Sequence, residues 1–400
     1  MSDAERRALE AGRGAFGQNW RPDRVAHAPG RLELLGNHVD YNGGQVLAAA
    51  IDRDVVCLSS GGIREGEIVA VFADRNPSQA FLMRPAALGD WRIPGGSARA
   101  ADYLRGVIAT GRARGIPMRT GVRLAIAGDV PIGFGLSSSA ALCVALTLTL
   151  HADDPAPMEL VRRAQEAEHR AGTPCGTMDQ SASVAGNVIL FEGASLSFKH
   201  LQPNLGPYAF AVADSGVGRS LSTSSYSTRV DESNQAVAQI SRQLGRSLPS
   251  LGALAESDLQ NVANLLDPIL LKRARHIVSE VARVRAGVTA LRANDWPAFG
   301  TLMNESGQSS AFDYEISHPR VEELVSEALG VPGVLGARMM GGGEGGTALI
   351  LLARDAFPTL VQRLGEGFYQ RHRLGEAAQR VLLQSFGPGA RRGAWSEPAG

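Results

Sequence analysis

The chain has 400 residues, of which 44% are hydrophobic and 20% charged, a composition that supports two domains with hydrophobic cores of their own. Its 40 basic and 40 acidic side chains give a formal net charge of zero, which argues against a basic surface for nucleic acid or for an anionic membrane. The longest apolar run, residues 140–150, is far shorter than the roughly 20 residues that cross a bilayer, so we expect no membrane partner.

Apolar spacing in the first half of the chain predicts a mixture of helices and strands. Residues 1–18 should form a helix, and residues 31–36 and 45–60 should form two strands around a polar turn. The elements expected next are a strand at 66–73, a helix at 100–115, a strand at 122–131, a glycine-rich turn at 132–135 and a buried helix at 136–152. The serines that open this last helix should cap its first turn.

The pattern changes near residue 205, where we expect a domain boundary. The elements expected before it are a helix at 156–172 and a hairpin built from 188–193 and 195–201. The elements expected after it are a strand at 208–217, a serine-rich loop, long helices to about residue 330, and a glycine loop at 341–346 that leads into a strand. The sequence therefore predicts an N-terminal domain at 1–205, a C-terminal domain at 206–388 and a disordered tail at 389–400.

The segment GRLELLGNHVDYNGG, at 30–44, gathers polar side chains of several kinds on one tight loop. Arg31 supplies a fixed cation, and Asn37, His38 and Asp40 supply short donors and acceptors. Such a set suits a ligand that is rich in hydroxyl groups. The alternative is an Asx turn, in which Asp40 and Asn42 hydrogen-bond to their own backbone.

The segment PIGFGLSSSAA, at 131–141, joins flexible glycines to the start of a helix. Glycines let a backbone approach a ligand closely, and the free N–H groups and positive dipole end of a helix attract anions. Phosphate is therefore a candidate ligand, and the serine hydroxyls add donors and a ligand for a hard cation. The alternative is a serine-capped helix of the core. The P-loop is excluded, because neither lysine of the chain follows a glycine.

Two carboxylates and a glycine run complete the candidate site. Glu168, with a serine hydroxyl, offers the oxygen ligands that Mg²⁺ prefers, and Asp179, after the turn in CGTMDQ, is placed to accept a proton or to orient a hydroxyl. The alternative is a solvated glutamate and an aspartate that caps a helix. The run GGGEGG at 341–346 is either a ligand loop or a hinge.

Taken in order, GRLELLGNHVDYNGG, PIGFGLSSSAA and GGGEGG resemble the signatures of the GHMP kinase family, and the first resembles that of the galactokinases in particular. CGTMDQ and FDYEISHP, at 312–319, are also similar to galactokinase segments. The resemblance implies a two-domain α+β fold, with an amino-terminal domain like ribosomal protein S5 and a ferredoxin-like carboxy-terminal domain. It also implies ATP-dependent phosphorylation of the anomeric hydroxyl of a sugar bound in the cleft.

The resemblance assigns roles to individual residues. Asp179 matches the catalytic aspartate of the family, and Arg31 matches the arginine beside it. The resemblance implies sugar contacts for Asn37, His38, Asp40, Gly176 and Tyr226, a phosphate loop of Gly133, Gly135, Leu136, Ser137, Ser138, Ser139 and Ala140, and magnesium ligands at Ser139 and Glu168. An arginine beside an aspartate favours the charged carboxylate, so Asp179 should be a weak base, and alignment and charge neutralisation should supply most of the acceleration.

Two neighbouring positions depart from the family pattern. Galactokinases usually carry glutamate where Asn37 stands, a residue that holds the 6-hydroxyl of the sugar, and asparagine where Glu33 stands. From the sequence, the site has lost an ionised acceptor, which would weaken sugar binding and loosen selectivity at C6. The amide of Asn37 is also a donor, which would tolerate a carboxylate at that carbon.

We therefore expect a kinase that uses ATP and Mg²⁺ to convert D-galactose to α-D-galactose 1-phosphate. The alternatives are a 1-kinase for galacturonate, a pentose or an amino sugar, and a non-catalytic sensor of sugar and ATP on the same scaffold. Three widely spaced cysteines and an amino terminus without the apolar core of a signal peptide predict a cytoplasmic protein. We expect a monomer, with a homodimer as the alternative.

Overall fold

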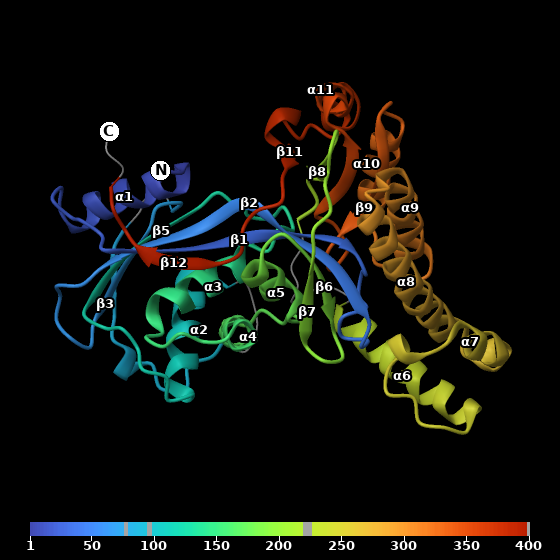
Figure 1. Ribbon diagram of the computed structural model, residues 1–400, viewed down its shortest axis with the longest axis horizontal. Coiled ribbons are helices and arrows are strands. Elements are labelled where there is room, and N and C mark those ends of the chain that lie inside the picture. Colours follow the sequence, from blue (N-terminus) through green and yellow to red (C-terminus); the bar gives the residue numbers. More distant parts are fainter. Residues whose placement is uncertain (76–78, 94–97, 219–225, 398–400) are drawn as a thin grey trace.

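The computed structural model describes residues 1–75, 79–93, 98–218 and 226–397, and its strands lie in two sheets on which the helices pack (Figure 1). The strands of the larger sheet are β1 (Arg24–Leu35), β2 (Gln45–Ser60), β3 (Ile68–Phe72), β4 (Phe81–Met83), β5 (Val122–Gly128), β6 (Val188–Glu192), β7 (Ser197–Leu201) and β12 (Arg391–Ala394). The strands of the smaller sheet are β8 (Tyr208–Asp214), β9 (Val334–Met340), β10 (Thr347–Ala353) and β11 (Val381–Gln384).

The α-helices lie between these strands along the chain, with α3 to α5 in succession before β6 and α6 to α10 in succession before β9. They are α1 (Asp3–Phe16), α2 (Ala100–Ala113), α3 (Ser138–Leu150), α4 (Pro157–Arg170), α5 (Met178–Ala185), α6 (Tyr226–Leu244), α7 (Glu256–Val262), α8 (Pro268–Ala293), α9 (Trp296–Phe312), α10 (Pro319–Leu329) and α11 (Phe357–Leu364). Two sheets with helices in this arrangement confirm the expected α+β class. The expected boundary at residue 205 falls between β7 and β8, which belong to different sheets.

The larger sheet has the order β12-β1-β2-β5-β3-β4, and the long strand β2 pairs with β6 near its start and with β5 near its end. Helix α1 packs on one face of this sheet, where Ala4, Ala8 and Leu9 meet Val56 and Leu58 of β2. Helices α2, α3 and α4 lie on the other side (Figure 1). Residues 140–150 of α3 are all buried, which confirms the buried helix expected from its apolar sequence.

The smaller sheet is antiparallel throughout, in the order β11-β8-β10-β9. Helix α9 packs against β9, and α8 lies beside α9 and also reaches β1 and β2 of the larger sheet. The C-terminal helices α8 and α9 therefore touch β1 and β2, the two strands that flank the turn within residues 30–44. This contact is what brings residues from both halves of the chain to one place.

The end of the chain differs from the expected disordered tail. After β11 the chain returns to the larger sheet, where β12 pairs with β1 along Arg391–Ala394 (Figure 1). All four residues of β12 are exposed, so the strand lacks the alternation of apolar and polar residues that would identify it in a sequence. Residues 398–400 of the expected tail lie outside the described residues.

Strand β1 is longer than expected, because it begins at Arg24 rather than at residue 31 and passes through a proline. The register with β2 shifts between Pro29 and Arg31, which places the proline at a β-bulge. At Gly30 a side chain would lie 2.6 Å from the carbonyl oxygen of Leu136, and the N–H of Arg31 donates to that oxygen at 3.0 Å. The bulge thus holds the glycine loop before α3 against β1.

We expect a pair of glycine substitutions to test how closely α2 approaches α4. A Cβ on Gly106 of α2 would lie 2.2 Å from the carbonyl oxygen of Ala167 in α4, whereas a Cβ on Gly14 of α1 would meet nothing within 4 Å. Gly106→Ala should lower the free energy of unfolding by about 1–3 kcal/mol through overpacking. Gly14→Ala, the matched control, should raise it by up to about 1 kcal/mol through helix propensity. Urea unfolding measures both, and equal effects would contradict the close packing.

Candidate active site

Helix α3 begins at a residue with a strained backbone, and its first turn has no side-chain cap. Ser137, the N-cap residue, has φ 57° and ψ 47°, in the left-handed region that residues other than glycine rarely adopt. Its hydroxyl does not cap the helix but donates a hydrogen bond to Oδ2 of Asp179. The expectation that serines cap this helix is therefore wrong at Ser137, because the carboxylate takes the hydroxyl. The first N–H groups of α3 are left without a side-chain cap and can bind an anion.

Asp179 lies in the first turn of α5, and both of its oxygens are engaged. Nε and a terminal nitrogen of Arg31 each lie 2.8 Å from Oδ1, while Ser137 donates to Oδ2. Arg31 is only 3% exposed, and it also donates to the carbonyl oxygen of Gly135 at 2.5 Å. A single arginine therefore ties Asp179 to the glycine loop, so the carboxylate, the cation and the helix start form one unit.

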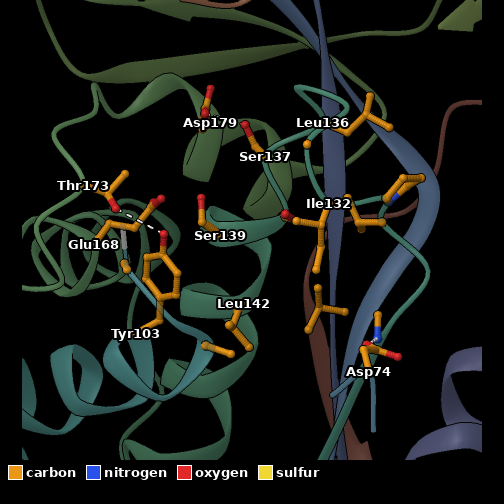
Figure 2. Close-up of a pocket in the computed structure, with 18 of the residues that line it drawn as sticks. Asp74, Tyr103, Ile132, Leu136, Ser137, Ser139, Leu142, Glu168, Thr173 and Asp179 are labelled. Carbon is orange, nitrogen blue, oxygen red and sulfur yellow. Dashed lines mark hydrogen bonds between the residues drawn. The ribbon is translucent and has the colours of Figure 1, made fainter. Parts of the chain in front are cut away.

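Glu168 of α4 lies close to the same helix start and is buried (Figure 2). Its Oε2 accepts hydrogen bonds from Gln180 and, at 3.7 Å, from the thiol of Cys175. Burial raises the pKa of Glu168 to about 7, the charge of Asp179 adds to this, and hydrogen bonds from Ser139 and Gln180 oppose it. A carboxylate with this pKa is one that would gain from a cation beside it.

A cavity of about 860 Å³ extends along the start of α3 to the larger sheet. Its polar end is lined by the glycine loop and the acidic residues, namely Gly133, Gly135, Leu136, Ser137, Ser138, Ser139, Glu168 and Asp179. Its other end is mostly apolar, and its lining there includes Asp74 as well as Val55, Phe72, Ile126, Val130 and Leu142. Figure 2 shows Ser137 and Asp179 at one end of this cavity and Leu142 and Asp74 at the other. Ala140 does not line it and lies buried in α3.

A second, smaller cavity of about 80 Å³ lies beside the first. Its lining includes the polar residues Arg31, Glu33, His38, Asp40, Tyr41, Asp179 and Tyr226 and the glycines Gly36, Gly176, Gly341 and Gly342. Asp179, Pro174 and Cys175 line both cavities. Asp179 therefore stands at the point where a ligand in one cavity would meet a ligand in the other.

Asp40 and Gly176 lie against one another in the wall of the smaller cavity. Burial raises the pKa of Asp40 to about 6, and the charges of Glu33 and Asp179 add to this. A Cβ on Gly176 would lie 2.3 Å from Oδ2 of Asp40, so only glycine leaves the carboxylate where it is. Two of the five residues that the sequence placed among the sugar contacts are thus in direct contact.

Aromatic rings form another wall of the smaller cavity. The ring of Tyr226 lies 5.6 Å from that of His38 and 5.3 Å from that of Tyr41. The Tyr41 hydroxyl is 2.9 Å from Nδ1 of His38 and 2.8 Å from the hydroxyl of Tyr314, which in turn lies 2.9 Å from Oγ of Ser233. The structure therefore brings His38 and Tyr226 together, although 188 residues of sequence separate them.

Asn37, like Ala140, is a predicted site residue that lines neither cavity. Its side chain is fully buried, its Nδ2 donates to Oε1 of Glu33 at 2.8 Å and to the carbonyl oxygen of Gly341 at 2.9 Å, and its Oδ1 accepts from Ser310 at 3.2 Å. Glu33 lines the smaller cavity in its place. Arg338 of β9 fixes Glu33, with a terminal nitrogen 3.1 Å from Oε1.

The loop that carries Asn37 is held by buried groups of α8 and α9. Oε1 of Glu280 accepts hydrogen bonds from the backbone N–H of Gly36 at 2.9 Å and of Asn37 at 3.2 Å, and from Ser306 at 2.7 Å. Its Oε2 accepts from Arg283 at 2.6 Å. Nε2 of His276 donates to the carbonyl oxygen of Asn37 at 3.0 Å. The position of the loop is thus set by helices more than 200 residues further along the chain.

Several of these residues were missed from the sequence. Tyr314 lies in FDYEISHP, a segment that could have suggested it. In the sequence, Glu33 stands out only as a departure from the family pattern. Glu280 has no local signal, because an isolated glutamate in a helix usually faces solvent. The hydroxyl of Tyr103, 3.1 Å from Oγ1 of Thr173, also lines the larger cavity and was not expected (Figure 2).

The described part of the chain holds neither a membrane-spanning helix nor a cluster of metal-binding side chains. None of its helices is long and apolar enough to span a bilayer. Nowhere in it do three or more His, Cys, Asp or Glu side chains gather as a metal-binding group.

Comparison with known proteins gives a consistent result. The galactokinase galactose-binding signature matches residues 13–60, and the N-terminal and C-terminal domains of the GHMP kinases match residues 99–187 and 288–370. The chain is 35% identical to the galactokinase of Homo sapiens over 90% of its length and 91% of that protein. It is 37% identical to the galactokinase of Chloroflexus aurantiacus over 87% of its length and 88% of that protein.

Solved structures show the same likeness. The chain superposes on the galactokinase of Lactococcus lactis in complex with galactose with a TM-score of 0.84 and 26% identity, over 96% of this chain and 98% of that one. It also resembles a mevalonate kinase with a TM-score of 0.62 at 15% identity, over 91% and 99% of the two chains, a likeness of fold. These superpositions confirm the fold class expected from the sequence.

We expect Glu280→Gln to lower the free energy of unfolding and to make this free energy less dependent on pH between 7 and 3.5. Burial alone would raise the pKa of Glu280, but the charges of Arg283, His276 and Arg338 and the hydrogen bond from Ser306 outweigh it and lower that pKa to about 2. A group whose pKa is lowered by folding stabilises the protein above its unfolded pKa, here about 4.5, and loses this contribution as pH falls toward 2.

The substitution breaks a buried ion pair, which costs about 3 kcal/mol at neutral pH. Urea unfolding at pH 7 and at pH 3.5 measures both effects. The difference in unfolding free energy between variant and wild type should be smaller at pH 3.5 than at pH 7. An equal difference at the two pH values would contradict a charged Glu280 as the group that holds the loop.

Proposed function

Because the chain belongs to the galactokinase family of the GHMP kinases, we propose that it transfers the γ-phosphoryl group of ATP to the anomeric hydroxyl of D-galactose. The product is α-D-galactose 1-phosphate. One observation carries the proposal: Asp179 lines both cavities and is fixed there by Arg31 and Ser137. A phosphoryl transfer between two ligands needs a group of this kind at their meeting point.

The larger cavity suits a nucleotide. Its apolar end, between the sheet and α3, offers a purine ring the side chains of Phe72, Ile126 and Leu142. Its polar end offers phosphate oxygens the uncapped first turn of α3 and the glycine loop. The triphosphate would then point toward Asp179.

Asp179 acts mainly by alignment. The sugar oxygen forms a bond to the γ-phosphorus while the bond from that phosphorus to the β–γ bridging oxygen breaks, and the hydroxyl proton passes to Asp179. In a loose transition state this proton leaves late, so a fixed carboxylate that orients the hydroxyl is more useful than a strong base. Arg31, held against the glycine loop, neutralises charge that develops on the transferred oxygens.

Glu168 and Ser139 fit a magnesium ion. One buried carboxylate and one hydroxyl at a helix start provide the oxygen donors that Mg²⁺ prefers, and Mg²⁺ takes its remaining ligands from phosphates and water. When bound, the ion would neutralise charge on the phosphates. Glu168 is held in place for this by Gln180.

The charges of the smaller cavity favour a neutral sugar. Glu33, Asp40 and Asp179 bring three carboxylates to its wall. Arg31 is paired with Asp179, and Arg338 is paired with Glu33. Among the described residues that line the cavity, there is thus no arginine or lysine without an acidic partner. A uronic acid would set its own carboxylate against these groups, so galactose is favoured over galacturonate.

A panel of sugars tests the proposal. ADP release should be measured with D-galactose, D-galacturonate, D-galactosamine and L-arabinose at saturating ATP and Mg²⁺. We expect D-galactose to give the highest kcat/KM. Turnover of galacturonate without turnover of galactose would overturn the choice of substrate, and calorimetric binding of galactose and ATP with no ADP released would show a sensor.

We expect Asp179→Asn to remove turnover but not sugar binding. The amide keeps the shape of the side chain but cannot accept the proton, so kcat should fall by at least about a hundredfold, while the dissociation constant for galactose should change only a few-fold. Asp154→Asn, on an exposed aspartate, is the control and should leave kcat unchanged. Wild-type turnover in Asp179→Asn would refute the role of this carboxylate.

A further inference from the structure

The carboxylate of Glu33 has a place in the smaller cavity that no assigned role explains. Glu33 is buried, and its side chain lines the cavity together with Arg31 and Asp40. Within the described residues, both partners of its carboxylate, Asn37 and Arg338, lie at Oε1. Oε2 has no hydrogen-bond donor in that part of the chain. A carboxylate held by one oxygen presents the other to whatever fills the cavity.

We propose that Glu33 is a specificity-determining residue, whose carboxylate accepts a hydrogen bond from a hydroxyl of the sugar, and that Asn37 is the residue that positions it. The inference rests on the proposed function, which identifies the substrate as a sugar. The contacts that place Glu33 in the cavity wall do not depend on the chemistry at Asp179. The amide of Asn37 donates to Oε1 of Glu33 at 2.8 Å and to the carbonyl oxygen of Gly341 at 2.9 Å. These two hydrogen bonds hold the Glu33 carboxylate from the side away from the cavity.

The strand geometry places this contact away from the reacting end of the sugar. Arg31 and Glu33 are two residues apart in β1, in regular register with Ala50 and Ala48 of β2, so their side chains share a face. Their Cα atoms are about 7 Å apart along such a strand. Arg31 binds Asp179 at the reacting hydroxyl, and Glu33 therefore meets a hydroxyl on the far side of the ring from C1.

The environment of Glu33 supports this role over a purely structural one. Arg338 is fully buried, and besides its contact with the Glu33 carboxylate it donates to the backbone oxygens of Glu33 at 2.6 Å and of Met339 at 2.8 Å. Strands β1 and β9 are thus joined at this point through the Arg338 guanidinium without any need for Oε2 of Glu33. After burial itself, the charge of Glu33 is the largest of the contributions that raise the pKa of Asp40, so the two carboxylates face the same space.

The test is a double-mutant cycle between protein and substrate. KM and kcat should be measured for wild type and Glu33→Gln with D-galactose and with its 2-, 4- and 6-deoxy analogues. We expect Glu33→Gln to raise KM for galactose about tenfold, because a neutral acceptor replaces a charged one, with kcat changed less. For the 4- or the 6-deoxy sugar, the effect of the substitution should disappear, while for the 2-deoxy sugar it should persist.

Two further variants keep the test decisive. Glu33→Asp retains the charge beside Arg338 but withdraws it by one methylene, so it should fold normally and raise KM as well. Glu192→Gln is the matched control, since Glu192 accepts a hydrogen bond from an amide, Gln45, at 2.7 Å on the same sheet but lines neither cavity; it should leave KM unchanged.

An equal effect of Glu33→Gln on KM for galactose and for all three deoxy sugars would overturn the inference. It would show that Glu33 has only a structural role. Coupling to the 2-deoxy sugar alone would overturn the placement argued from β1. These results differ from failure of the proposed function, in which wild type itself would not phosphorylate galactose.

Discussion

The buried carboxylate of Glu280 is the contact on which the site depends. Glu280 accepts hydrogen bonds from the backbone N–H groups of Gly36 and Asn37. Arg283 and Ser306 donate hydrogen bonds to the Glu280 carboxylate and hold it in place. Buried backbone donors without partners are costly, so the loop adopts its functional form only when α8 is packed beside it. The smaller cavity is therefore a product of both halves of the chain.

The larger cavity is assembled differently, because all of its lining residues except Gly218 come from the N-terminal half of the chain. The bulge at Gly30 brings β1 against Leu136, and Arg31 then reaches both the glycine loop and Asp179. Ser137 adopts a strained conformation and gives its hydroxyl to Asp179, which leaves the start of α3 open. An open anion site at this helix start costs stability, because the Ser137 backbone is strained and the first turn of α3 has no side-chain cap. Burial of the apolar residues 140–150 of α3 offsets this cost.

The sequence predicts elements whose signal is local. The mostly apolar sequences of α3 and β5 predict these two elements, and the order of the motifs indicates the family. What the sequence cannot supply is the direction of single side chains. Glu33 and Asn37 look like two polar residues of one loop, and only Arg338, some 300 residues away, fixes which of them faces the cavity. Strand β12 was missed for the opposite reason, because an exposed edge strand needs no apolar pattern.

The central claim is that Asp179 stands between a sugar in the smaller cavity and a triphosphate on the start of α3. A crystal structure with D-galactose and a non-hydrolysable ATP analogue bound tests it most directly. The account predicts the anomeric oxygen within hydrogen-bond distance of Asp179, with the γ-phosphate facing that oxygen across the junction of the two cavities. A sugar bound elsewhere, or a triphosphate turned away from Asp179, would contradict it.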